Sequence, residues 1–218
     1  MKKKALDKNL TELVFVIDRS GSMQGLEKDT IGGVNSVLEK NRAVEGEAFV
    51  TIILFDHEIK YLYDHVDLRK VSNLTPADYQ VRGCTALLDA VGEAIEHTGR
   101  VHHYVPKSFR PKNVICTIVT DGLENASKRF TYRQIKQLIE KKETQGWEFL
   151  FLGANIDVAA EAGKLGISRE NAAPYVADDK GTFIAYEAVA HAQVARRTVG
   201  AMPCGWADSV RADAAKRG

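Results

Sequence analysis

The chain has 218 residues, 44% of them hydrophobic, and its 30 Lys and Arg residues nearly balance its 29 Asp and Glu residues. This length and composition predict one globular α/β domain with a sizeable core. A net charge of +1 excludes the broad basic field that is typical of proteins that bind nucleic acid or acidic membranes.

Residues 1–9 are expected to form an N-terminal tail. Residues 1–4 are basic, but a polar stretch follows them instead of the apolar segment that a secretory signal needs. No later run approaches the roughly 20 apolar residues of a membrane span. The three cysteines, among them Cys116 inside an apolar run, are an odd number and predict no disulfide framework. We therefore expect a cytoplasmic protein with Cys116 as a buried thiol.

The first 66 residues contain three apolar runs and one helical segment. The run at 13–17 is continuous, as in a strand buried on both faces. A helix is expected over about 26–42, where Gly32-Gly33 would allow close packing against the sheet. The runs at 49–55 and 59–66 are separated by three residues, too few for a parallel crossover, and therefore predict an antiparallel pair.

From about residue 75 onward, the alternation of helices and strands continues. Thr75-Pro76 marks a short turn with a helix-start signal, and a helix over 86–98 is followed by a polar loop over 99–112. Residues 199–218 form a C-terminal tail that is either docked or frayed. The remaining expected elements are a strand at 114–120, a helix with a capping box at 131–143, a strand at 149–152, a helix at 157–165, a short strand at 174–177 and a helix at 182–198.

This pattern predicts a domain over residues 10–198 with an α/β, doubly wound and mainly parallel sheet. One antiparallel strand lies at an edge, and helices cover both faces. The expected strand order is 3-2-1-4-5-6. Such sheets bind ligands beyond the carboxyl ends of the strands, where the strand order reverses.

Three polar segments fall at that reversal. Asp18-Arg19-Ser20-Gly21-Ser22 directly follows the first strand, Thr85 begins the helix before the fourth strand, and Asp121-Gly122 ends the fourth strand. Taken alone, each segment is also an ordinary turn or helix cap. Together they bring hard oxygen ligands to one crevice, which is the ligand type that Mg²⁺ or Mn²⁺ prefers.

The pattern Asp-x-Ser-x-Ser, then Thr, then Asp resembles the metal-ion-dependent adhesion site of the von Willebrand factor type A (VWA) family. The likeness in element order extends over about residues 10–198 and implies a Rossmann-like VWA fold. It looks most similar to small intracellular bacterial members, some of which are found beside stress-response and tellurite-resistance proteins. The five motif positions are occupied by Asp18, Ser20, Ser22, Thr85 and Asp121.

The resemblance also implies roles for these residues. Ser20 and Ser22 would bind the cation directly, Asp18 and Asp121 mostly through water, and Thr85 in either way. The implied function is a non-enzymatic module in which an Asp or Glu of a partner protein completes the metal shell. Bacterial relatives often act with AAA+ ATPases, kinases, phosphatases or stress-response complexes, and the sequence does not choose among these partners.

A metal-assisted phosphohydrolase that uses the same acids is the alternative function. Ser20 stands two residues after Asp18 where an aspartyl-phosphate enzyme of the haloacid dehalogenase type has a second Asp. A Gly-x-Ser-x-Gly elbow is absent, and no His lies beside the motif in the sequence as a general base. A nucleotide- or RNA-binding scaffold is opposed by the near-neutral charge and the missing glycine fingerprint.

Other polar residues have ordinary explanations as well as functional ones. The pair His102-His103 is not expected to bind metal, because adjacent side chains point apart and no third ligand follows at metal spacing. Three further segments are open to two interpretations, either contact with a ligand or partner, or local packing and pairing: Arg82, Glu124-Asn125, and Trp206 with Met202. Cys84, beside Thr85, is either a reactive thiol at a helix start or a residue of ordinary loop packing.

Overall fold

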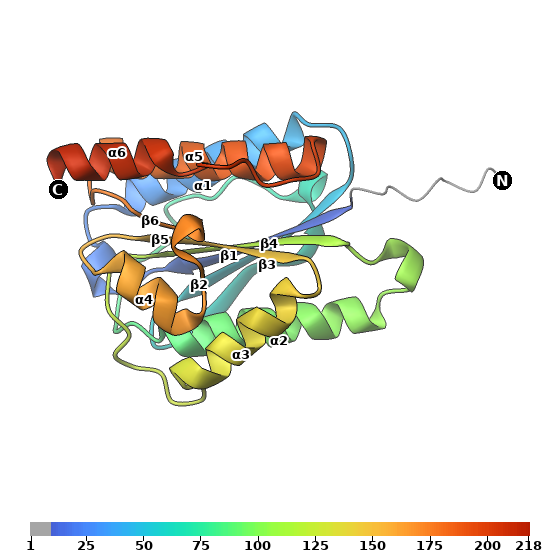
Figure 1. Cartoon of the computed structure of the whole chain (residues 1–218), viewed down its shortest axis with the longest axis horizontal. Helices are drawn as coiled ribbons and strands as arrows, with labels where there is room; N and C mark the ends of the chain where they lie inside the picture. Colours follow the sequence, from blue (N-terminus) through green and yellow to red (C-terminus); the bar gives the residue numbers. More distant parts are fainter. Residues whose placement is uncertain (1–9) are drawn as a thin grey trace.

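The computed structural model describes residues 10–218, so the tail expected over residues 1–9 lies outside the described residues. The strands are β1 (Thr11–Asp18), β2 (Ala48–Phe55), β3 (Ile59–Asp67), β4 (Asn113–Thr120), β5 (Trp147–Gly153) and β6 (Ala172–Pro174). They form one sheet in the order β3-β2-β1-β4-β5-β6, with only β3 antiparallel to its neighbour (Figure 1). This confirms the predicted doubly wound topology and its antiparallel edge strand.

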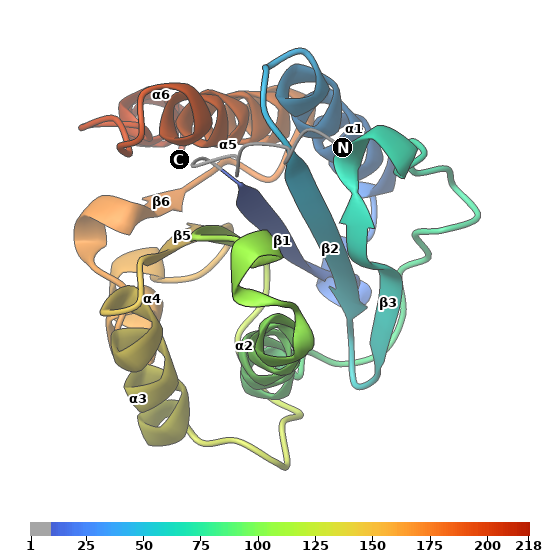
Figure 2. The same ribbon diagram turned by 90° about the vertical axis from the view of Figure 1, so that its right-hand side faces the viewer.

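Helices cover both faces of the sheet, as Figures 1 and 2 show. One face carries α1 (Glu27–Arg42), α5 (Asp179–Thr198) and α6 (Asp208–Arg217), and the other carries α2 (Leu87–Tyr104), α3 (Tyr132–Glu143) and α4 (Val158–Leu165). In β1, Leu13 and Phe15 belong to the core under α1 and α5, while Val14 and Val16 belong to the core under α2, α3 and α4. Because both faces are buried, β1 is apolar at consecutive positions.

Three elements differ from the sequence prediction. α2 continues to Tyr104 and replaces the first part of the loop expected at 99–112. Thr98 and His102 lie on its buried side, so the buried face continues through polar residues that apolar periodicity does not detect. The last strand is centred on buried Ala172 and Ala173 instead of residues 174–177, and α6 forms within the C-terminal tail.

The C-terminal segment packs on the domain. Trp206 is 9% exposed and belongs to the same core as Val210, while Met202 packs against that core. The indole of Trp206 donates to the carbonyl of Glu170 (3.1 Å). Arg211 donates to the carbonyl of Ala172 (3.1 Å), the first residue of β6. These contacts favour local packing for Trp206 and Met202.

Residues 10–218 contain no helix that is both long enough and apolar enough to cross a membrane. Cys116 lies fully buried in β4. Burial raises the pKa of this thiol to about 12, which keeps it protonated and unreactive.

Two adjacent glycines of α1 have opposite surroundings. A Cβ atom on Gly33 would lie 2.2 Å from the ring of Tyr186 in α5, whereas a Cβ atom on Gly32 would have nothing within 4 Å. Close packing at Gly33 is therefore with α5. This location corrects the expectation that the pair packs against the sheet.

Gly33→Ala should lower the free energy of unfolding by about 1–3 kcal/mol, because the buried ring of Tyr186 must move. Gly32→Ala should raise it by roughly 0.5–1 kcal/mol, because alanine favours an open helix position. Urea unfolding of both variants measures this difference. Equal effects in the two variants would contradict the close contact between α1 and α5.

Candidate metal centre

Asp18 joins the ends of the two central strands. Its Oδ2 accepts a hydrogen bond from the Thr120 hydroxyl at the end of β4 (2.6 Å), and its Oδ1 accepts one from the backbone N–H of Ser20 (2.7 Å). Tyr79 donates its hydroxyl to the Asp18 carbonyl (2.5 Å). The side chain is fully buried, so both carboxylate oxygens are held in fixed positions.

The two serines meet the second acid of the site. The Ser22 hydroxyl donates to Oδ1 of Asp121 (2.5 Å), and the hydroxyl oxygens of Ser20 and Ser22 are 3.1 Å apart. Ser20 precedes a short 3₁₀ turn (Gly21–Met23), but its side chain makes no capping hydrogen bond. Helix capping therefore does not explain these hydroxyls. Asp121 Oδ2 is buried and has no hydrogen-bond partner among the described residues.

Thr85 is also not a helix cap. α2 begins at Leu87, one residue later than the expected start at 86, and its N-cap residue is Ala86, which makes no side-chain capping bond. The backbone of Thr85 is held by Asn125, which accepts from the Thr85 N–H through its side chain (2.9 Å) and donates its own N–H to the Thr85 carbonyl (3.0 Å). A Cβ atom on Gly122 would lie 3.0 Å from the Ser22 hydroxyl oxygen and 3.1 Å from that of Thr85. The bare glycine thus leaves room between two potential ligands.

Backbone contacts fix the loop before Thr85 against the serine loop. Arg82 donates its N–H to the carbonyl of Arg19 (2.8 Å), and Gly21 donates its N–H to the carbonyl of Gly83 (3.1 Å). The Arg82 side chain bonds to Asp56 (2.8 Å) and to Glu58. Arg82 therefore pairs with local acids in this structure.

Glu124 anchors the start of α2. Its Oε2 accepts from the backbone N–H of Leu88 (2.9 Å), and its Oε1 accepts from those of Ala126 (2.9 Å) and Ser127 (2.7 Å). The carboxylate is therefore used locally, at the positive end of a helix. Cys84, next to Thr85, is exposed, and no contact in the structure decides between its two interpretations.

The two acids of the site are electrostatically strained without a cation. Burial raises the pKa of Asp18 from 3.8 to about 6, against hydrogen bonds from Thr120 and Ser20 that lower it, and the charge of Asp121 raises it further. Burial also raises the pKa of Asp121, although the bond from Ser22 lowers it. A bound dication would relieve both effects, because an opposite charge favours the ionised carboxylates.

A crevice of about 280 Å³ opens beside Ser22 and Asp121. Three further acids line it, Asp29, Asp178 and Asp179, of which Asp178 is paired with Arg217 (2.5 Å). The hydroxyl and carboxylate donors, the unpartnered Asp121 oxygen, the space at Gly122 and the acidic lining all fit a hard divalent cation.

The structure thus brings the five motif residues to one edge of the sheet. It adds partners that the sequence analysis missed, namely Thr120, Tyr79 and the positioning role of Asn125. The sequence predicts Thr120 only as the last residue of an apolar strand. Its hydroxyl, immediately before the motif residue Asp121, is the one local feature that could have indicated a polar role. Tyr79 carries no local signal, because its partner is 61 residues away in the chain.

No protein-family model matches the chain, and no curated protein matches it. Solved structures match its fold. Proximal thread matrix protein 1 of the mussel byssus, in a structure with a zinc-occupied MIDAS motif, is 16% identical, with a TM-score of 0.57 over 84% of this chain and 46% of that chain. A von Willebrand factor type A protein from Catenulispora acidiphila is 14% identical, with a TM-score of 0.55 over 84% of this chain and 42% of that one.

Manganese-loaded TRAP protein of Plasmodium vivax is 16% identical, with a TM-score of 0.56 over 80% of this chain and 71% of that chain. The chain spans less than half the length of the mussel and Catenulispora structures. At these identities the likeness is one of fold. The chain therefore has the α/β Rossmann-like fold of VWA domains.

The raised pKa of Asp18 predicts a pH dependence of stability in the absence of metal. The native state binds the Asp18 proton more tightly than the unfolded state, so this group's stabilising contribution is present at low pH and is lost as pH rises from 3.8 through about 6. With EDTA present, Asp18→Asn should therefore gain stability relative to wild type over this interval, by on the order of 2–3 kcal/mol. Thermal unfolding of both proteins between pH 4 and pH 7.5 measures the gain. A constant difference across the interval would contradict it.

Proposed function

We propose that this protein is a divalent-cation-dependent protein-binding module in which Asp18, Ser20, Ser22, Thr85 and Asp121 hold Mg²⁺ or Mn²⁺. The observation that carries the proposal is the buried, unpartnered Oδ2 of Asp121, which lies on the same carboxylate that the Ser22 hydroxyl contacts. The zinc-occupied MIDAS motif of the mussel protein and the manganese-loaded TRAP protein support a divalent cation in this fold.

The residues of the site have distinct tasks in this proposal. The hydroxyls of Ser20, Ser22 and Thr85 are neutral ligands, so they leave the cation electrophilic. Asp18 already accepts two hydrogen bonds, which suits a positioning and charge-balancing task. When bound, the cation would supply an open position for a carboxylate from another protein.

Charge makes this capture depend on metal. Without a cation, the acids of the crevice would repel a partner's Asp or Glu side chain, whereas a bound dication would attract it. Leu123 follows the site directly and is 57% exposed. We propose that it contacts an apolar residue next to the partner's acidic side chain.

We infer the biological setting from the resemblance to small bacterial VWA proteins. The protein would act in the cytoplasm of a bacterium, in a stress-response or tellurite-resistance context, with an AAA+ ATPase, a kinase, a phosphatase or another component of a stress complex. The near-neutral charge disfavours nucleic acid or a membrane as the partner. No observation favours the alternative of a metal-assisted phosphohydrolase, and we propose a non-enzymatic role.

Mg²⁺ or Mn²⁺ should raise the melting temperature of the wild type, with a stabilisation of about 2.7 kcal/mol when the free cation is 100 times its Kd. Asp121→Ala, and Ser20→Ala combined with Ser22→Ala, should abolish this gain. Gly122→Ala should reduce it, because the new methyl group crowds Ser22 and Thr85. Differential scanning fluorimetry with metal and with EDTA measures each effect.

Gly163→Ala is the matched control for Gly122→Ala, because a Cβ atom on Gly163 would have nothing within 4 Å. This control should keep the full gain from metal. Equal stabilisation of wild type and Asp121→Ala would place the cation elsewhere.

Immobilised wild-type protein with Mg²⁺ should retain a partner from an extract of the source cells, whereas Asp121→Ala, or wild type with EDTA, should not. Mass spectrometry identifies the retained protein. Replacing the partner's contacting Asp or Glu by Asn or Gln should then weaken binding at least about tenfold, because the charged ligand of the metal is lost. Retention of the same proteins under all conditions would contradict capture through the cation.

A further inference from the structure

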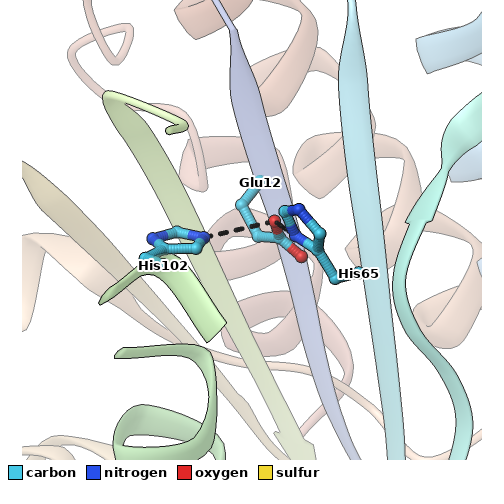
Figure 3. Close-up of side chains that lie close together, drawn as sticks. All are labelled: Glu12, His65 and His102. Atoms are coloured by element: carbon cyan, nitrogen blue, oxygen red, sulfur yellow. Dashed lines mark hydrogen bonds and ion pairs between the residues drawn. The ribbon is translucent and has the colours of Figure 1, made fainter. Parts of the chain in front are cut away.

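A second polar cluster lies at the opposite end of the sheet from the candidate metal centre. Glu12, at the start of β1, is fully buried, and its Oε2 lies 2.6 Å from Nδ1 of His65 and 3.3 Å from Nε2 of His102. Figure 3 shows Glu12 between the two imidazoles. The proposed protein-binding function does not use these residues.

The fold brings the three side chains together from distant parts of the chain. β3 departs from regular pairing with β2 between Val50 and Ile52, and His65 in this irregular stretch has a φ angle of 51°. A positive φ is costly for a residue other than glycine, and bulges redirect side chains. His102 comes from the last part of α2, in the segment that was expected to be a loop.

Packing holds both imidazoles in place. His65 stacks on Phe49 with ring centroids 4.1 Å apart, and His102 packs against Trp147 at 6.3 Å. Thr51 donates its hydroxyl to Glu12 Oε1 (2.8 Å) and accepts the backbone N–H of His65 (3.0 Å). Thr51 thus orients the carboxylate and the strand that carries His65, as outer partners of metal ligands do.

A buried carboxylate needs a compensating positive charge, which can be a protonated imidazole or a metal ion. Within residues 10–218, the side-chain nitrogen atoms bonded to Glu12 are those of His65 and His102. These nitrogens and the carboxylate oxygen all lie within 4.8 Å of one another. Two imidazoles and one carboxylate are a ligand set of zinc sites.

One of the three ligand separations already matches what zinc requires. With zinc–ligand bonds of about 2.0–2.2 Å, neighbouring ligands of a tetrahedral ion stand roughly 3.3 Å apart. The pair of His102 and Glu12 already has a separation of 3.3 Å. The pair of His65 and Glu12 is at hydrogen-bond distance, so it must open by about 0.7 Å when metal replaces the shared proton. The His65 side chain is 18% exposed, which gives solvent access for the ion and a water ligand.

We propose that Glu12, His65 and His102 form a second metal site, selective for a transition-metal dication of the zinc type. Imidazole nitrogens suit Zn²⁺ and Co²⁺, whereas Mg²⁺ prefers oxygen ligands. The two sites therefore differ in chemistry as well as in location. The second site stands at the amino-terminal end of β1, and the first stands at its carboxyl-terminal end.

The test uses the full chain carrying Asp121→Ala, which removes the first site from the measurement. After treatment with a chelator and in excess Mg²⁺, this protein should bind one Co²⁺ per chain with the visible absorption of a tetrahedral ion, and Zn²⁺ should displace it. Adding His102→Gln should weaken binding at least about tenfold, since even outer partners contribute this much. His103→Gln is the matched control, because His103 is the exposed neighbour on the same helix, and it should leave binding unchanged.

Equal weakening by His102→Gln and His103→Gln, or no bound Co²⁺ in the Asp121→Ala protein, would overturn the second site and leave a hydrogen-bonded charge cluster. If His102→Gln fails to fold, X-ray absorption spectroscopy of the zinc-loaded Asp121→Ala protein still identifies the ligands of the ion. Two imidazoles and oxygen ligands are expected. An all-oxygen shell, or sulfur ligands from the exposed Cys84 or Cys204, would contradict the proposal. Failure of this site would leave the proposed binding function untouched, because that function depends on Asp121.

Discussion

The arrangement of the site depends on two carboxylates that are held at the ends of neighbouring parallel strands. Since β1 and β4 run in the same direction, Asp18 and Asp121 emerge at the same edge of the sheet, where the strand order reverses. The bond from Thr120 to Asp18 ties the two strand ends together. Burial then makes the negative charge unfavourable. A positive charge at this point would therefore be stabilising, and the hydroxyls of Ser20, Ser22 and Thr85, which come from two loops, lie at the same edge of the sheet.

The topology was predictable because it depends on gap lengths and on consecutive apolar positions. Only three residues separate β2 from β3, which forces an antiparallel pair, while every other connection has room for a crossover. The boundaries were less predictable. The last turns of α2 are buried by a polar residue, His102, and not by an apolar one. β6 contains only three residues. The Ala-rich α6 depends on Trp206 and Val210 for its packing. Tertiary contacts decide such elements, and local patterns do not.

The five candidate metal ligands were predictable because they fall in short motifs at strand ends. The structure brings these residues together. Metal binding itself stays a prediction. Their supporting partners were not predictable, because Tyr79 and Asn125 act on backbone atoms. The cluster of Glu12, His65 and His102 was missed for another reason. Spacing along the chain does not reveal that residues on two different strands and a helix lie close together in space. The direction of the His65 side chain also depends on an irregular stretch of β3. His102 has no third ligand at metal spacing along the sequence, whereas in space it lies beside Glu12 and His65, which are far away in sequence.

The docking of the C-terminal segment has a consequence for how this protein can associate with others. Exposed edge strands invite pairing with the backbone of another chain and so promote aggregation. Here β6 is three residues long, and Arg211 occupies the carbonyl of Ala172 at its start, while β3 at the opposite edge is interrupted by two irregularities in its pairing. Neither edge offers a long, regular template for an added strand. Recognition of another protein is thereby directed away from main-chain pairing and toward the side chains of the loops.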